Sequence, residues 1–149
     1  MDLRTQFMPL LGTWTGLEQQ HPSPWSPATT ARASLVFRLD VGATVVVQDY
    51  RQVRADGPEL TAHGVFQALP GSDRLQWWLF DSYAEPPVVA TGDWADGELT
   101  LEKTTANGTA RHRFRPTGDD LGYEITLRLG TATGWAPFLT GRYRRVSGH

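Results

Sequence analysis

Few residues of this chain could do chemistry inside a protein core, and Glu18 is the first of them. It follows Trp14 and Gly16 at alternate positions, so in a strand all three residues belong to one face. A carboxylate that faces an apolar interior must be paired or protonated. We expect Arg145, near the end of the chain, to be its partner. The pair would be a buried ion pair that closes the fold, which we favour, or a polar clamp for a ligand.

Asp81 and Tyr143 are the other polar candidates. Asp81 shares a face with Trp77 and Leu79 at the end of an expected strand. It is either a polar group at a pocket mouth or a cap on the following turn. The Tyr143 hydroxyl can donate to a ligand, or it can be satisfied within the core. Trp14 is expected to be structural and to fill one end of the fold.

The sequence lacks the residues and spacings that several kinds of catalytic or metal site require. The chain has no cysteine, which excludes disulfides, thiolate zinc sites and cysteine nucleophiles. His21, His63, His112 and His149 show no metal-ligand spacing, and there is no Gly-x-Ser-x-Gly or phosphate-loop motif. His21 and His149 are expected to be solvated. His112 lies on an otherwise apolar face and is expected to be a satisfied core histidine.

The elements that position these residues are one short helix and a series of strands. Apolar residues at helical spacing predict a helix over residues 3–11, which is too short to be stable unless it packs on something. After Gly12 the pattern alternates with a period of two. Strands are predicted over residues 12–20, 30–39, 43–54, 59–69, 74–83, 87–94, 97–104, 109–116, 121–129 and 135–146.

Short turns join most of these strands. Asp96-Gly97 and Asn107-Gly108 are dipeptides that accept the positive φ of tight hairpins, which makes neighbouring strands antiparallel. Closing such a meander removes its two exposed edges. We therefore predict an all-β fold: a closed, antiparallel, up-and-down barrel of about ten strands in a single domain, residues 1–149. The helix of residues 3–11 would plug one end of the barrel formed by residues 12–146, and the proline-rich segment 19–30 would fold across a mouth.

The alternation of apolar and polar residues also distinguishes the inward face of the predicted strands from the outward face. The predicted interior is apolar and aromatic, with few polar contacts. We expect the ligand-facing residues to be Trp14, Glu18, Phe37, Phe66, Trp77, Asp81, Phe114, Phe138, Tyr143 and Arg145. Trp78 and Phe80 fall on the opposite face of a strand that is also apolar inside. Such a strand needs cover from the helix or from a second subunit, so a homodimer is expected.

Length and charge narrow the function classes. A chain of 149 residues is long enough for one sizeable core. Its net charge of −2 lacks the basic footprint of nucleic-acid binding. No apolar run is long enough for a membrane helix, and the N-terminus lacks the apolar core of a secretory signal. We expect a cytoplasmic protein.

Motifs near the N-terminus resemble a known group of barrels. Gly12-Thr13-Trp14-Thr15-Gly16 has the Gly-x-Trp form that begins the first strand of lipocalins and their relatives, the calycins. Further motifs resemble an uncharacterised bacterial calycin-like family: Phe80-Asp81-Ser82, Gly92-Asp93-Trp94, residues 96–101, Trp135-Ala136-Pro137-Phe138 and Arg142-Tyr143-Arg144-Arg145. This resemblance implies a calycin-type barrel and no particular activity.

Two better-understood relatives bear on the ligand. Nitrobindins are haem barrels that begin Gly-x-Trp-x-Gly and hold iron by a last-strand histidine about five residues before a tyrosine. Counting back from Tyr143, that position here is Phe138, which cannot ligate iron. Fatty-acid-binding proteins hold a carboxylate with a last-strand Arg and Tyr, and Tyr143 with Arg145 is similar in reversed order.

The sequence therefore favours a barrel that binds a small hydrophobic molecule, with no cofactor, metal or catalytic residue predicted. One alternative is an enzyme of isomerase or decarboxylase type, in which Glu18 or Asp81 works with Tyr143 or His112. Another is a haem protein of nitrobindin type. A barrel with a filled interior and a purely structural role is the simplest alternative.

Overall fold

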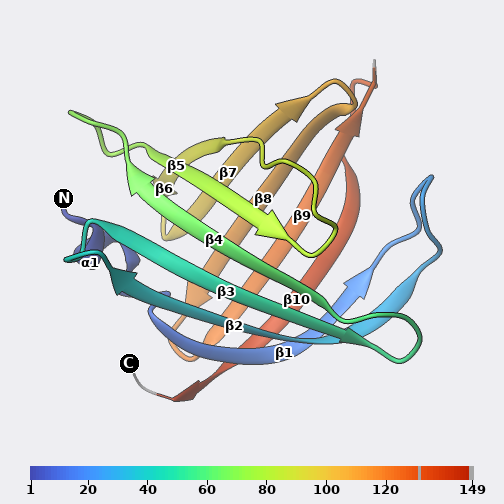
Figure 1. The fold of residues 1–149 in the computed structure, drawn as a ribbon, viewed down its shortest axis with the longest axis horizontal. Helices are drawn as coiled ribbons and strands as arrows, with labels where there is room; N and C mark the ends of the chain where they lie inside the picture. The colour runs from blue at the N-terminus through green and yellow to red at the C-terminus, as the bar shows by residue number, and fades with distance from the viewer. Residues whose placement is uncertain (131, 148–149) are drawn as a thin grey trace.

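A closed ten-strand antiparallel barrel forms the whole domain (Figure 1). The computed structural model describes residues 1–130 and 132–147. Each strand pairs with its neighbours in the sequence, and β1 pairs with β10 to close the wall. The elements are α1 (Leu3–Phe7), β1 (Gly12–Gln20), β2 (Thr29–Asp40), β3 (Val45–Arg54), β4 (Leu60–Ala68), β5 (Leu75–Asp81), β6 (Ala90–Ala95), β7 (Glu98–Thr105), β8 (Gly108–Thr117), β9 (Asp120–Leu129) and β10 (Ala136–Ser147).

The predicted all-β barrel is confirmed, and turn chemistry explains its regular hairpins. Asp96 and Gly97 join β6 to β7 with φ of 53° and 76°, which only residues tolerant of the left-handed region adopt without strain. β6 begins at Ala90 rather than at residue 87, because the adjacent prolines 86 and 87 cannot donate to the ladder. The β5–β6 seam is consequently short, running from the Leu75–Gly92 pair to the Trp77–Ala90 pair.

The helix is shorter than predicted. α1 covers Leu3–Phe7, and a turn follows it to residue 10. Asp2 caps the helix by accepting a hydrogen bond from the Thr5 amide at 2.8 Å. A single turn and a half cannot hold together without tertiary contacts. Those contacts come from the barrel end, where α1 lies (Figure 1).

The helix and the turn after it plug that end. Phe7 and Leu10 are 0% exposed. The Phe7 ring lies 5.0 Å from the Phe66 ring and 5.7 Å, edge to face, from the Trp94 ring. The predicted plug is thus present, and it contributes a large share of the core.

The expected cover for the outside of β5 does not come from α1, because the helix lies within the barrel end. Trp78 is 37% exposed and Phe80 is 50% exposed on the outer face. The expectation that the helix covers this face is therefore wrong. Cover by a second subunit stays a prediction.

Within the described chain, no helix has the length and apolar character needed to cross a membrane.

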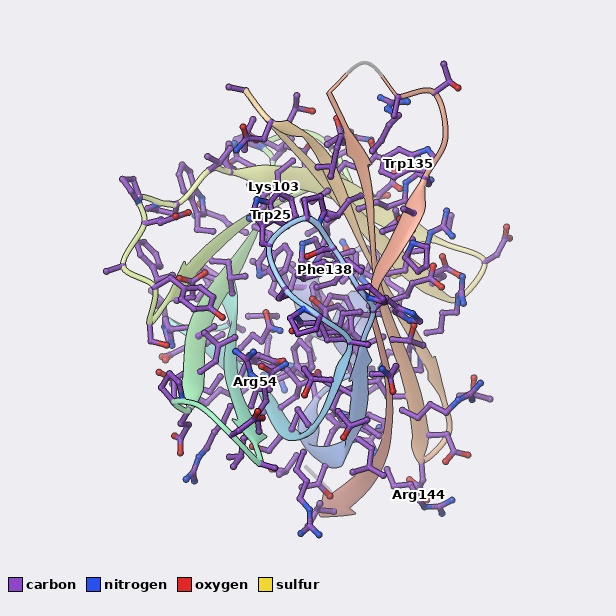
Figure 2. All side chains as sticks on the ribbon, turned by 90° about the vertical axis from the view of Figure 1, so that its right-hand side faces the viewer. Trp25, Arg54, Lys103, Trp135, Phe138 and Arg144 are labelled. Carbon is purple, nitrogen blue, oxygen red and sulfur yellow. The ribbon has the colours of Figure 1, made fainter. Side chains whose placement is uncertain are left out.

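At the end opposite α1, the segment between β1 and β2 forms a flap. Ser23 and Ser26 bridge each other across its tip, and the His21 amide donates to the Phe138 carbonyl at 2.8 Å. Figure 2 views the barrel from this end and shows the loop that carries Trp25 in front of the strands. The flap therefore lies at the open mouth, as its prolines and length predicted.

Candidate functional site

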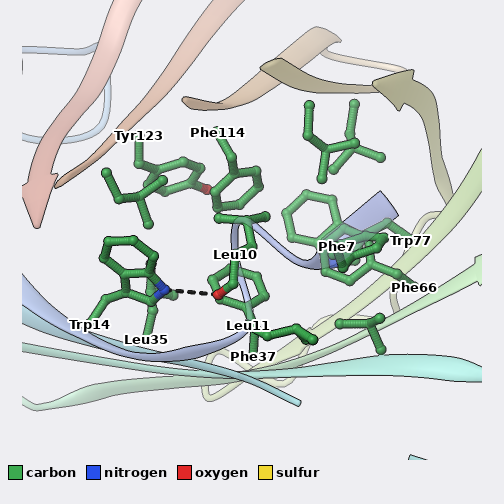
Figure 3. Close-up of a cluster of buried hydrophobic side chains, with 14 of the residues drawn as sticks. Phe7, Leu10, Leu11, Trp14, Leu35, Phe37, Phe66, Trp77, Phe114 and Tyr123 are labelled. Carbon is green, nitrogen blue, oxygen red and sulfur yellow. Dashed lines mark hydrogen bonds between the residues drawn. The ribbon is translucent and has the colours of Figure 1, made fainter. Parts of the chain in front are cut away.

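The interior around the helix is filled (Figure 3). Trp77 stacks on Phe66 with ring centroids 5.4 Å apart, and both are at most 1% exposed. The Trp14 indole donates to the Leu10 carbonyl at 2.9 Å, which ties the first strand to the plug. This half is a close-packed core.

The other half of the interior is lined by inward-facing side chains that are only half-buried. On β5, Leu75 and Trp77 are 0% and 1% exposed, whereas Leu79, the next inward position, is partly open. On β7 the same change occurs between Leu101 and Lys103. Because the wall is closed, exposure of an inward side chain means that open space lies in front of it. We call this space the hollow; its half-buried lining comprises Tyr50, Arg54, Ala62, Leu79, Lys103, Ala110, Ile125, Leu127 and Phe138.

A buried polar cluster lies where the filled half meets the hollow. The Glu18 carboxylate, in a residue 2% exposed, accepts hydrogen bonds at one oxygen from the Tyr50 hydroxyl at 2.5 Å and the Gln52 amide at 2.7 Å. Its other oxygen accepts a short hydrogen bond from the Tyr143 hydroxyl. Three donors thus offset the cost of burying this charge.

Strand register explains how β10 contributes to the cluster. Gly141 is the β10 partner of Glu18, and Tyr143 is the next inward residue. A Cβ on Gly141 would lie 2.9 Å from the Cε2 and hydroxyl oxygen of Tyr143. The absence of that Cβ lets the Tyr143 ring fold back over the glycine and reach Glu18.

The tyrosines of the cluster are hydrogen-bond donors. Burial raises the pKa of Tyr50 and of Tyr143, and the neighbouring Glu18 carboxylate raises both pKa values further. Both hydroxyls therefore keep their protons far above neutral pH.

A second polar pair continues along the interior. The His112 Nδ1 and the Tyr123 hydroxyl lie 2.6 Å apart, and both residues are buried. Burial, with a smaller effect of the Lys103 charge, lowers the pKa of His112 to about 3. The imidazole is therefore neutral at physiological pH, and the prediction of a satisfied core histidine is confirmed.

A third polar contact is made possible by another glycine. The Trp77 indole donates to the Gln48 side chain at 3.1 Å. A Cβ on Gly64, between them in the register, would lie 2.6 Å from both bonding atoms. The Trp77 indole is thus satisfied, whereas the buried indole nitrogen of Trp94, beside Phe7 at the plugged end, has no hydrogen-bond partner among the described residues.

The structure brings Glu18 and Tyr143 together, as the interior prediction requires, but the expected pair of Glu18 with Arg145 is wrong. The Arg145 guanidinium lies at the helix end, over the Trp14 ring at 4.2 Å and 3.4 Å from the Asp119 carboxylate. It also donates to the carbonyls of residues 9 and 11. β10 runs along the whole wall, so two residues beyond Tyr143 the chain has already reached the plug.

The remaining predicted ligand residues divide between the two halves. Trp14, Phe37, Phe66, Trp77 and Phe114 are all within the filled half and are at most 1% exposed. Phe138 is half-buried at the hollow, beside an irregularity in the β10 register between Pro137 and Leu139. Asp81 accepts from the Tyr83 amide at 3.0 Å, so it caps the turn after β5.

Tyr50 and Gln52 were missed by the sequence reasoning, and Tyr123, whose alternation placed it inside, was not singled out as a site residue. Alternation along β3 contains the signal, because Val46, Gln48, Tyr50 and Gln52 occupy one face. That face is the polar one, so it does not stand out as the inside. A polar face turned inward is the unexpected feature of this barrel.

Metal ligation finds no support among the described residues, where no group of three His, Asp or Glu side chains could hold an ion. His21 lies 2.9 Å from the Thr140 hydroxyl, and His63 lies 2.8 Å from the Asp49 carboxylate. His149 lies outside the described residues. For haem, Phe138 stands where nitrobindins have their iron ligand, and His112 is enclosed by Tyr123 and Trp77, so neither of these two residues offers an iron ligand.

A separate groove of about 1310 Å³ crosses strands β8, β9, β10, β1, β2 and β3. Most of its lining residues alternate with the inward set along these strands, among them Leu17, Arg113, Arg115 and Arg142. Residues of the inward set, including Glu18, Arg54, Tyr123 and Tyr143, also border it. Arg113 and Arg115 are held by ion pairs to Glu98. The groove therefore lies mainly on the outer surface, although Arg54 borders both the groove and the hollow.

Comparison with known proteins supports the fold. The crystal structure of Rv2717c from M. tuberculosis aligns over 97% of each chain with a TM-score of 0.75 and 18% identity. The S-type phycobiliprotein lyase CPES from Guillardia theta aligns over 100% of this chain and 95% of its own, with a TM-score of 0.71 and 12% identity. No protein family and no curated protein matches the sequence. These likenesses show the fold alone, a closed antiparallel barrel.

Proposed function

We propose that this protein binds a small, largely hydrophobic molecule in the hollow. The observation that carries the proposal is the contrast between fully buried inward side chains at the plugged end and half-buried ones at the open end. Apolar groups such as Leu79, Ile125 and Phe138 would lose solvent contact on binding, which is favourable. A concave, mostly apolar space with a few fixed polar groups is the usual form of a small-molecule site.

The polar cluster favours binding over acid–base catalysis. Tyr50 and Tyr143 have raised pKa values and do not give up protons near neutral pH. His112, with its pKa of about 3, is not a proton donor in that range. A general acid or base works best with a pKa near the working pH. These groups are suited to fixed hydrogen bonds, which orient a ligand or stabilise the wall.

Family membership and cellular location are further parts of this proposal. The motifs that resemble the uncharacterised bacterial calycin-like family cover nearly the whole chain, and we propose on this basis that the protein belongs to it. The cysteine-free composition supports a cytoplasmic protein.

A pair of tryptophan substitutions on adjacent residues tests the binding site. Ala62 faces the hollow from β4, and Thr61 faces outward beside it. Titration with the fluorescent hydrophobe 1-anilinonaphthalene-8-sulfonate should show that Ala62→Trp weakens binding by on the order of tenfold or more, about 1.4 kcal/mol. Thr61→Trp should leave it unchanged.

Native mass spectrometry of the purified protein provides a second measurement, because a resident hydrophobe would add its mass. Binding that is equal in both variants, with melting temperatures unchanged, would locate the probe outside the barrel and contradict the proposal. Wild-type protein that binds no hydrophobic probe would do the same.

A further inference from the structure

Two cationic side chains face the hollow, Arg54 on β3 and Lys103 on β7. Arg54 continues the inward series of Tyr50 and Gln52, and Lys103 continues that of Leu101. Both are half-buried, and Figure 2 shows them on different sides of the open end. Lys103 is the only lysine of the chain. Such cations normally lie on the outer surface, where water solvates them.

Arg54 is incompletely satisfied. One of its terminal nitrogens donates to the Tyr83 hydroxyl at 3.2 Å. Its Nε is buried and has no acceptor among the described residues. A guanidinium carries five N–H donors in a planar fork that matches an oxyanion. A buried donor without an acceptor costs free energy, so the site favours a ligand that provides one.

Lys103 has neither a hydrogen bond nor an ion pair within the part of the chain that the structure describes. Its ladder partner on β8 is Ala110, whose methyl group can neither hydrogen-bond to the ammonium group nor pair with its charge. The Lys103 charge contributes to the lowered pKa of His112, which pairs with Leu101 at the preceding inward position of the same ladder. The adjacent buried imidazole is neutral and cannot compensate this charge.

The acidic groups of the inner wall are engaged elsewhere. Glu18 accepts from three donors, Tyr50, Gln52 and Tyr143. Asp81 accepts from the Tyr83 amide. No described carboxylate lies within ion-pair distance of Arg54 or Lys103. The cations of the hollow are thus left for an anion that is not part of this chain.

We infer that the ligand of the hollow is an amphipathic carboxylate whose apolar part lies against Leu79, Ile125 and Phe138. Its charged group binds Lys103, and Arg54, on another side of the open end, adds to the positive potential there. This inference rests on the proposed binding function and adds the chemical class of the ligand. It uses cations of β3 and β7, so it is independent of Tyr143 and Arg145 on the last strand. The apolar part supplies the favourable burial, and the cations select a charged head group over a neutral one.

A matched pair of ligands distinguishes the proposed binding of a hydrophobic molecule from the inferred preference for a carboxylate. Binding of dodecanoate and of methyl dodecanoate, which share the same chain, is measured by displacement of the fluorescent probe. We expect dodecanoate to bind on the order of tenfold more tightly, as one charge-assisted contact provides. Lys103→Met should abolish most of this preference, Lys103→Arg should retain it, and Arg54→Met should reduce it about threefold. Arg51→Met, on the outer face of the same strand as Arg54, is the control and should change nothing.

Amine modification gives an independent readout, because Lys103 and the N-terminus are the only amines of the chain. Intact-mass measurement of acetylation should show that dodecanoate protects Lys103 more strongly than the ester does. If acid and ester bind equally, or if Lys103→Met keeps the preference, this inference is wrong while the binding function stands. If neither ligand displaces the probe, the inference fails together with the proposed function.

Discussion

The two halves of this barrel share the same strands but are built on different principles. On β5, Leu75 and Trp77 belong to a close-packed core, and two residues later Leu79 faces open space. The same change occurs on β1, where Trp14 packs against the plug and Glu18 belongs to a polar cluster. The difference shows that closing the wall does not fill a barrel. The plug fills one half, and the other half stays available.

This division separates stability from binding. The filled half buries large aromatic side chains, and its apolar burial is the main source of the folding free energy. The hollow half retains its shape because the polar groups at its floor satisfy one another. Its lining can therefore carry unusual groups such as Lys103 without unfolding the chain.

The largest expected effect is on the plug. Phe7→Ala removes a fully buried ring that contacts Phe66 and Trp94, and it should reduce the free energy of unfolding by about 4 kcal/mol. Phe138→Ala, the same change at the half-buried hollow, should cost about 1 kcal/mol. Urea denaturation of both variants measures the two values. Equal losses would show that the two halves do not differ in packing.

The second expected effect is the dependence of stability on pH, which His112 causes at the boundary between the two halves. His112 has a pKa of about 3 when folded and 6.5 when free, so the unfolded chain binds the proton first as the pH falls. Stability is therefore complete above pH 6.5 and is lost below it. Between pH 7.5 and 4.5 the loss should be roughly 3 kcal/mol.

The matched variant for this measurement is His112→Gln, which cannot titrate. Its unfolding free energy should depend less on pH across the same window, where most carboxylates stay ionised. A wild-type curve that is flat between pH 6.5 and 4.5 would mean that the imidazole is accessible to protons in the folded protein. The filled half would then extend less far than the structure indicates.

The third effect lies in the floor of the hollow. Tyr143→Phe removes one of three donors to the Glu18 carboxylate and should cost about 2 kcal/mol, because the charge stays buried. Tyr83→Phe removes a hydroxyl from a residue 62% exposed and should cost at most about 0.5 kcal/mol. Thermal unfolding of the two variants gives the comparison. A Tyr143→Phe protein as stable as wild type would show that Tyr143 contributes little to holding the charge.

The barrel could be predicted from the sequence because its signals are local. Asp96-Gly97 sets a tight turn by its own backbone preference, and alternation around Phe37 or Phe114 needs only neighbouring residues. The plug was also predictable, since a helix this short must pack on something. Its exact length was not, because the turn after Phe7 is set by contacts with the barrel end.

The site was less predictable, because it depends on register between distant strands. Glu18 was expected inside, but its partners come from β3 and β10, and their side chains meet only once the wall is closed. Arg145 has the right charge for Glu18 but lies beyond it along β10, at the plug. The polar inner face of β3 contradicted the general pattern of apolar interiors, so Tyr50 and Gln52 were not recognised.

The smallest effect on folding is expected on the outer face of β5. Trp78 and Phe80 are exposed beside β4, and we propose that a second copy of the chain covers them. Trp78→Ser should change the unfolding free energy of the monomer by at most about 0.5 kcal/mol, since the ring is already partly in water. Sedimentation velocity should show a dimer for wild type and a shift to monomer for Trp78→Ser, while Thr61→Ser on the neighbouring strand leaves it dimeric. A wild-type protein that sediments as a monomer at high concentration would contradict the dimer and leave the contrast between the two halves intact, because neither half depends on this face.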